Sequence, residues 1–472
     1  AQRGIAFETE ARVIGRVADQ HDPAPTAFPQ IGNAALDQRR TNALPLQFGP
    51  DADRAEPEPP LAAIGDGDRR KRGMADDPRR ILGHQRQRQI AFGAQLAHQL
   101  LLVAEKLLGD KSLAAEFLSG FGEMDDDEKR AFFSHLATEM NIDPEAVRTA
   151  LDAYEQAPSK ATYRAYMAAA EPRRQELIRR LNSLPGATRA LVEMRADLLR
   201  LGRGTPELEA LDLDFRHLFA SWFNRGFLVL RPINWESPAH ILEKITQYEA
   251  VHAIHSWDDL RRRLEPQDRR CFAFFHPAMP DEPLIFVEVA LTRGTPGSVQ
   301  ALLTSERETL REDEADTAVF FSISNCQAGL ASISFGNSLI KQVAADLSAG
   351  LPGLKTFVTL SPIPGLTRWL DSEGYEWQGA SSEQMRALAA HYLLNAKLDN
   401  GDPVDPVARF HLGNGAIVHA VHGEADTSEN GRKQSGGTMV NYLYDLAKVA
   451  QNHEQFATTR QMVATSEVRS LA

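Results

Sequence analysis

The period of the apolar and polar positions changes along this chain near residue 204. Before that point, apolar side chains recur every three or four positions, as in Phe132, Phe133, Leu136 and Met140, which predicts amphipathic helices. After it, helical stretches alternate with short apolar runs that predict strands at 271–275, 284–291, 317–324 and 356–360. Strands that alternate with helices favour a mixed sheet with helices packed on it.

Three parts of the chain follow from this pattern. Residues 1–96 sustain neither period, so we expect a low-order segment or one created by a start assigned too far upstream, with Met74 as a later candidate. Residues 97–203 predict a helical domain, and 204–472 an α/β domain. The Gly- and Pro-containing stretch 202–206 is the predicted linker between them. The helical part carries no convergent reactive side chains, so its role is either subunit assembly or a plain scaffold.

Composition narrows the class of protein. Of 472 residues, 43% are hydrophobic and 25% charged, which is typical of a globular protein, and the net charge of −12 argues against general nucleic-acid binding. Cys271 and Cys326 are the only cysteines, so we expect no disulfide framework and a reducing, cytoplasmic location. Neither a CxxC nor an HExxH pattern suggests a metal, and no stretch approaches the roughly 20 apolar residues of a membrane span.

The α/β part is organised around residues 317–365. A buried strand at 317–324 is followed by the small-residue segment 327–337, a helix through 339–347, and a strand at 356–360 that prolines stop. Small residues before a helix N-terminus offer free N–H groups and the positive end of the helix dipole to an anion. This stretch therefore predicts a pyrophosphate site, with an ordinary strand-to-helix turn as the alternative.

Three features of the same part could carry chemistry. Ser361 lies between a strand end and two prolines, so its backbone is held in one place. His411 stands just before a Gly-Asn-Gly turn, where an imidazole can exchange protons near neutral pH. Tyr442 and Tyr444 alternate as in a strand. Taken singly, a Ser-Pro pair usually forms a turn, a histidine is usually a hydrogen-bonded core or surface residue, and a tyrosine pair usually serves packing.

Several separate motifs change this interpretation. They are NWESP at 234–238, HPAMP at 276–280, SIS at 322–324, LSPIPG at 360–365, PVARFHL at 406–412 and MVNY at 439–442. In their order and spacing over roughly residues 110–447, the chain resembles the malonyl-CoA decarboxylase family. The resemblance implies an α+β protein in which an N-terminal helical bundle precedes an acetyltransferase-like (GNAT-type) α/β catalytic domain with a mixed sheet.

The resemblance also implies an activity and a site. The reaction would convert malonyl-CoA to acetyl-CoA and CO2, with Ser361 hydrogen-bonding the malonyl group, His411 protonating the enolate and Tyr444 supporting the site. The expected CoA-binding loop consists of Ala331, Ser332, Ile333, Ser334, Phe335, Gly336 and Asn337. Ser334 stands where the family often has a glutamate, and the acetyltransferase signature is imperfect because Gln327 is one residue too close to Gly329.

Further expectations accompany that reaction. No cofactor is needed beyond the CoA that enters as part of the substrate, and fatty acid metabolism is the expected setting. The helical part resembles the family's oligomerising domain, so we expect a homo-oligomer, either a dimer or a tetramer. Because a fold alone does not fix a reaction, two alternatives remain. These are another CoA-dependent N- or O-acyltransferase, and a non-catalytic acyl-CoA-binding module.

Overall fold

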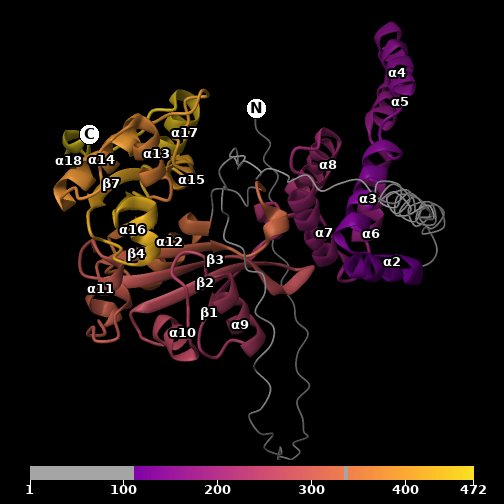
Figure 1. Cartoon of the computed structure of the whole chain (residues 1–472). Helices are drawn as coiled ribbons and strands as arrows, with labels where there is room; N and C mark the ends of the chain where they lie inside the picture. Colours follow the sequence, from indigo (N-terminus) through magenta and orange to yellow (C-terminus); the bar gives the residue numbers. More distant parts are fainter. Residues whose placement is uncertain (1–110, 334–338) are drawn as a thin grey trace, which may run out of the picture. The chain divides into compact units, whose positions relative to one another are not determined.

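The computed structural model describes residues 111–333 and 339–472 (Figure 1). Its N-terminal part is helical: α2 (Lys111–Glu123), α3 (Asp126–Thr138), α4 (Pro144–Gln156), α5 (Lys160–Ala170), α6 (Arg173–Asn182), α7 (Ala187–Leu201) and α8 (Pro206–Trp222). A mixed sheet with helices on both faces follows in the chain. The predicted fold class, α+β with an N-terminal helical bundle ahead of a mixed sheet, is confirmed.

Local capping explains where these helices begin. The Asp125 side chain accepts the Glu128 N–H while the Glu128 carboxylate accepts the Asp125 N–H, so a capping box starts α3. Asp143 caps α4 and Pro144 occupies its first turn. The apolar stripe that the sequence shows on α3 is buried in the core of the bundle. Helix α8, which begins at Pro206, the last residue of the predicted linker, packs against α3 and α6.

Helices α4 and α5 form a pair that projects away from the other helices (Figure 1). No residue of either helix is buried. Leu151 on α4, with Tyr163 and Met167 on α5, expose 36%, 51% and 49% of their surface. Large apolar side chains are therefore presented to the outside on a part of the bundle that has no core of its own.

The strands form one eight-stranded sheet: β1 (Val229–Ile233), β2 (Arg269–His276), β3 (Met279–Thr292), β4 (Thr317–Asn325), β5 (Thr356–Thr359), β6 (Ser361–Pro362), β7 (Ile417–His422) and β8 (Met439–Leu443). Their order is β1-β2-β3-β4-β5-β8-β6, with β7 also paired to β8. Only the β4–β5 pair is parallel among the described strands. The four strands predicted from apolar runs all occur, as β2, β3, β4 and β5.

The parallel pair separates as the chain proceeds. Its ladder runs from Thr317 opposite Thr356 to Phe320 opposite Thr359. Beyond that point β4 continues to Asn325 along β3, whereas the segment after β5 enters β6, which pairs with β8. The sheet is thus splayed within the unit 317–365, and Ser361 lies where the two strands part.

Helices cover both faces of the sheet: α9 (Ala239–Tyr248), α10 (Trp257–Leu264), α11 (Val299–Leu303), α12 (Leu339–Gly350), α13 (Leu366–Glu373), α14 (Ser382–Asn395), α15 (Pro406–Gly413), α16 (Glu429–Ser435), α17 (Val449–Thr459) and α18 (Ser466–Leu471). Apolar residues of α9 and α10 pack on one face. Those of α12 to α15 pack on the other, where they meet Tyr442 and Tyr444. The second face therefore buries the candidate tyrosines.

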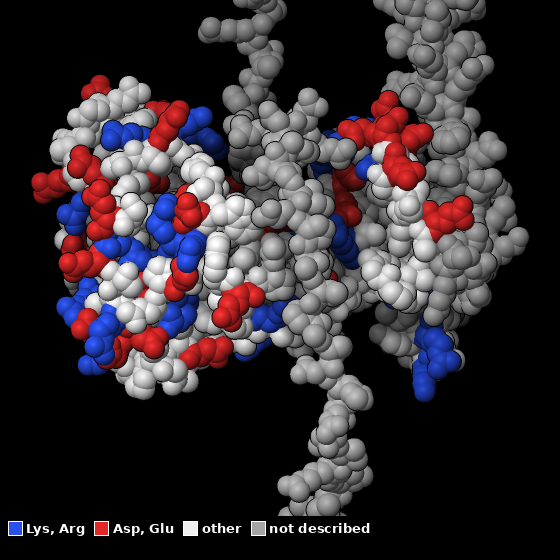
Figure 2. All heavy atoms as spheres, turned by 90° about the horizontal axis from the view of Figure 1, so that it is seen from below, with Lys and Arg blue, Asp and Glu red and all other residues white. Residues whose placement is uncertain are grey.

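The surface of this fold carries charges of both signs. Figure 2 shows Lys and Arg side chains interspersed with Asp and Glu over the described residues of one face. Within 111–333 and 339–472, no helix has both the length and the apolar character needed to cross a membrane. The same residues contain no group of three or more His, Cys, Asp and Glu side chains that could hold a metal ion.

Candidate active site

Ser361 is placed by the separation of the two parallel strands. It is the first residue of β6, pairs with Val440 of β8, and is 6% exposed. Pro362, directly after it, fixes the backbone dihedral at its own position and restricts that of Ser361. The Ser361 hydroxyl donates to Oγ1 of Thr359 over 2.8 Å, and its Oγ lies 3.2 Å from Nε2 of His411.

His411 lies in the last turn of the short helix α15. Both of its ring nitrogens have partners, because Nε2 faces Ser361 and Nδ1 lies 2.8 Å from the hydroxyl of Tyr444. The ring also stacks on Tyr442, with centroids 4.5 Å apart and planes at 22°. His411 is 2% exposed, and burial alone lowers the pKa of its imidazole to about 3. The ring is therefore neutral at physiological pH in this structure.

Tyr442 belongs to β8 and Tyr444 directly follows it, and both lie against the histidine. Tyr442 is fully buried and Tyr444 is 1% exposed. Burial raises the pKa of both phenols well above their ordinary value, so both keep their protons. The structure thus brings together the three residues that the sequence singled out, as a chain from Ser361 through His411 to Tyr444.

Two residues of this cluster were not found from the sequence. Thr359 is fully buried, and its hydroxyl oxygen accepts hydrogen bonds from Ser361 and from the N–H of Tyr442. The available signal was its position two residues before Ser361, since alternate residues of a strand share a face. Asp405, the N-cap of α15, accepts from the N–H of Ala408 over 2.7 Å. Its signal was the Asp-Pro pair at a helix start.

Asp405 carries a buried carboxyl group, one oxygen of which accepts no hydrogen bond among the described residues. It is 2% exposed, and burial raises its pKa to about 7 against the opposing backbone hydrogen bonds at Ala408 and Val407. Its Oδ2 and the hydroxyl of Tyr442 are buried without a hydrogen-bond partner among the described residues. Burial is the main cause that raises the pKa values of Tyr442 and Tyr392, and the carboxyl of Asp405 raises both further.

The predicted CoA-binding loop is described only in part, since Ser334, Phe335, Gly336 and Asn337 lie outside the described residues. Ala331 and Ser332 are exposed, and Ser332 has a left-handed backbone with φ of 62°. Ile333 is buried together with residues of the helical bundle. Among the described hydrogen bonds of Ala331, Ser332 and Ile333, none reaches the Ser361–His411 chain.

The helical bundle holds this turn in place. Arg195 of α7 is 1% exposed and makes two hydrogen bonds to the carboxylate of Asp212, at 2.7 and 3.2 Å. Its Nη1 donates to the carbonyls of Gly329 and Ala331 at 2.7 and 2.9 Å. Gly329 belongs to the 3-10 turn η3 (Ala328–Leu330), which packs directly on α7. A buried, charge-assisted contact therefore fixes the chain where it approaches the predicted CoA loop.

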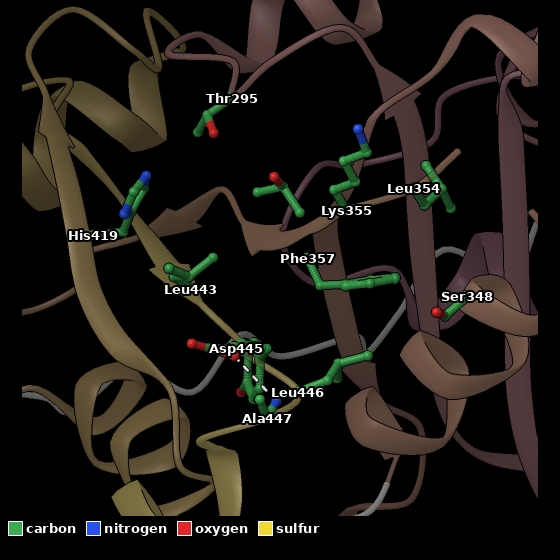
Figure 3. Close-up of a pocket in the computed structure, with 12 residues that line it drawn as sticks. Thr295, Ser348, Leu354, Lys355, Phe357, His419, Leu443, Asp445, Leu446 and Ala447 are labelled. Carbon is green, nitrogen blue, oxygen red and sulfur yellow. Dashed lines mark hydrogen bonds between the residues drawn. The ribbon is translucent and has the colours of Figure 1, made fainter. Parts of the chain in front are cut away.

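A hollow of about 530 Å³ lies beside β5 and the end of β8 (Figure 3). Its lining includes Phe357, Leu443 and Tyr444 as well as Lys355 and His419. The exposed side chains of Lys355 and, in the same lining, Leu446 show that it opens to solvent. Neither Ser361 nor His411 lines it, whereas Tyr444, which lines it, is a hydrogen-bond partner of His411.

An N-terminal helical bundle followed by a mixed sheet, with a buried Ser–His–Tyr chain where its parallel pair separates, is typical of an α+β enzyme. Two protein-family models match this chain and identify its family. The malonyl-CoA decarboxylase C-terminal domain matches residues 226–383 and 372–472, and the malonyl-CoA decarboxylase N-terminal domain matches 140–223. The chain belongs to the malonyl-CoA decarboxylase family and is an enzyme of the carboxy-lyase class.

Individual relatives agree with this placement. The mitochondrial malonyl-CoA decarboxylase of Anser anser anser is 34% identical, over 63% of this chain and 69% of the relative, and that of Mus musculus is 32% identical, over 76% and 84%. The crystal structure of malonyl-CoA decarboxylase from Rhodopseudomonas palustris is 47% identical with a TM-score of 0.73, over 79% of this chain and 99% of that chain. The structure from Agrobacterium vitis is 45% identical with a TM-score of 0.74, over 80% and 98%.

Proposed function

We propose that this enzyme converts malonyl-CoA to acetyl-CoA and CO2, and that the Ser361–His411–Tyr444 chain carries out the proton chemistry. The bond between C2 and the malonyl carboxylate breaks, CO2 leaves, and the electron pair stays on the thioester as an enolate. The observation that carries the proposal is the buried chain of hydrogen bonds at the point where β4 and β5 separate. A water-excluded cluster of fixed donors stabilises developing enolate charge better than water does.

His411 is the proposed proton donor to C2. Its ring is neutral, and a neutral imidazole N–H can serve as an electrophile in a buried site. As the Nε2 proton leaves for C2, Nδ1 takes the proton of the Tyr444 hydroxyl, 2.8 Å away. A proton from solvent then restores the Tyr444 hydroxyl. The balance is one solvent proton consumed for each CO2 released.

Ser361 binds the reacting malonyl group in this proposal. Its hydroxyl hydrogen, which Thr359 directs away from His411, can be shared between Thr359 and an oxygen of the substrate. The turn at Ala331–Ile333, held by Arg195, is the proposed start of the CoA-binding loop. We further propose a cytoplasmic homo-oligomer that works in fatty acid metabolism, assembled through the helical bundle with its exposed apolar residues on α4 and α5.

Incubating the purified protein with malonyl-CoA, and following acetyl-CoA and CO2 together, tests the reaction. His411→Asn should lower kcat by roughly 10²–10⁴-fold, the usual range for general acid catalysis, with little change in KM. Ser361→Ala should also lower kcat, and the double variant should lose far less than the product of both effects if the residues act as a unit. Thioester binding without CO2 release would favour the acyl-CoA-binding alternative. Acyl transfer to an added amine or alcohol would favour an acyltransferase.

A further inference from the structure

The hydroxyl oxygen of Thr359 accepts hydrogen bonds from two donors. Thr359 ends β5, is fully buried, and accepts the Ser361 hydroxyl at 2.8 Å and the Tyr442 N–H at 3.1 Å. A threonine oxygen has two lone pairs, so both are occupied by these bonds. The proton of Ser361 therefore points at Thr359 and away from His411.

The direction of the Ser361 hydrogen bond determines which atom donates in the two hydrogen bonds of His411. With its proton on Thr359, Ser361 can only accept from His411, so the histidine carries a proton on Nε2. A neutral ring holds one proton, so Nδ1 is an acceptor and the Tyr444 hydroxyl donates to it. The neutral tautomer with hydrogen on the side of Ser361 follows from the contacts of Thr359.

We infer that Thr359 is a positioning residue that fixes the tautomer of His411 through the hydroxyl of Ser361. The inference rests on the proposed function for its catalytic consequence, because that tautomer presents the Nε2 proton toward the malonyl group. Without the Thr359 hydroxyl, Ser361 is released to donate to Nε2. The ring proton then moves to Nδ1 and faces Tyr444, on the side away from the substrate.

Thr359→Val tests this assignment, since valine has nearly the shape of threonine and lacks the hydroxyl. We expect kcat for malonyl-CoA to fall by roughly 10²–10⁴-fold, the scale on which a wrongly protonated catalytic histidine costs activity, while KM changes by less than about threefold. Thr359→Ser, which restores the hydroxyl, should recover most of the lost turnover. An unchanged kcat in a folded Thr359→Val protein overturns the inference.

A structural effect must be separated from a positioning effect, because Thr359→Val also leaves the Tyr442 N–H without its acceptor. Thr188→Val is the matched control: Thr188 is 3% exposed and donates to Asn182 over 2.8 Å in the helical bundle. It should lower the melting temperature without lowering kcat. In a Ser361→Ala background, Thr359→Val should cause no further loss of kcat, since the hydroxyl through which it acts is gone. An equal further loss there would mean a structural role.

Ring-nitrogen NMR of the 15N-histidine-labelled protein gives a readout that does not depend on turnover. Signals of His411 are identified by their absence in His411→Asn. Wild type should show a protonated Nε2 and an unprotonated Nδ1, and Thr359→Val should exchange the two patterns. The same pattern in both proteins contradicts the inference. If wild type releases no CO2 from malonyl-CoA, the proposed function fails, while this spectrum still judges the tautomer.

Discussion

Adding a single methyl group at Gly329 should show whether the helical bundle positions the turn ahead of α12. A Cβ at this position would lie 1.8 Å from the carbonyl oxygen of Val192 on α7 and 2.7 Å from its carbonyl carbon. Backbone atoms cannot rotate out of the way as a side chain can. Gly329→Ala therefore forces α7 and the η3 turn apart by more than an ångström.

The cost of that separation follows from Arg195. Its hydrogen bonds to the carbonyls of Gly329 and Ala331, at 2.7 and 2.9 Å, cannot both survive such a shift. Hydrogen bonds to charged groups contribute roughly 1.5–3 kcal/mol each, so losing both costs about 3–6 kcal/mol. Arg195 keeps its pair with Asp212, which places the expected effect toward the lower end of that range.

Thermal unfolding and steady-state kinetics on the same preparation are the assays. Gly329→Ala should lower the melting temperature by several degrees and raise KM for malonyl-CoA, while kcat at saturation changes little, because Ser361 and His411 do not contact the turn. Gly350→Ala is the control: Gly350 ends α12 with no atom within 4 Å of an added Cβ, so the substitution should be neutral or slightly stabilising. Wild-type stability and KM in Gly329→Ala would refute the argument.

Two other expectations can be checked directly. Burial raises the pKa of Asp405 to about 7 from 3.8, so the folded protein keeps a proton that the unfolded chain releases, and stability falls as pH rises between these two values. Asp405→Asn, which retains an oxygen to cap α15, should therefore gain melting temperature relative to wild type between about pH 4 and about pH 7. A constant difference across this range would count against the argument. The low pKa of His411 acts with the opposite sign in both proteins, so it cancels from the comparison. The exposed Tyr163 and Met167 on α5 predict a homo-oligomer by light scattering at micromolar concentration, which a Tyr163→Glu, Met167→Glu variant should weaken; a wild-type monomer would contradict this.

The architecture was accessible from the sequence wherever one physical signal dominated. Long apolar runs rich in β-branched and aromatic residues gave β2, β3 and β4, because strands buried on both faces need no alternation. The start of α4 is encoded locally as well, because Asp143 is a good N-cap and Pro144 is favoured in the first turn but not in a helix interior. These features are local, so one stretch of sequence contains all the information needed.

Contacts between distant segments had no such signal. Arg195 reads as one more charged residue on an amphipathic helix, and only the fold brings it to carbonyls 134 and 136 residues away. Thr359 reads as a strand residue, and its function depends on Ser361 and Tyr442 arriving on either side of it. Ser361, His411 and Tyr444 were found because the family resemblance joined segments that periodicity alone leaves separate.

The electrostatic character of the cluster bears on why such a site suits decarboxylation. In the described part of the chain, no Lys or Arg hydrogen-bonds to Ser361, His411 or Tyr444, and burial alone accounts for the low pKa of the histidine. A cation beside the malonyl carboxylate would stabilise the bound substrate more than the transition state, in which that group becomes neutral CO2. Neutral donors aimed at the thioester instead favour the state in which charge has moved to the enolate. Binding energy must then come from the CoA portion of the substrate. The hydrogen bonds from Arg195 to Gly329 and Ala331 hold the start of the proposed CoA-binding loop, so they bear directly on catalysis.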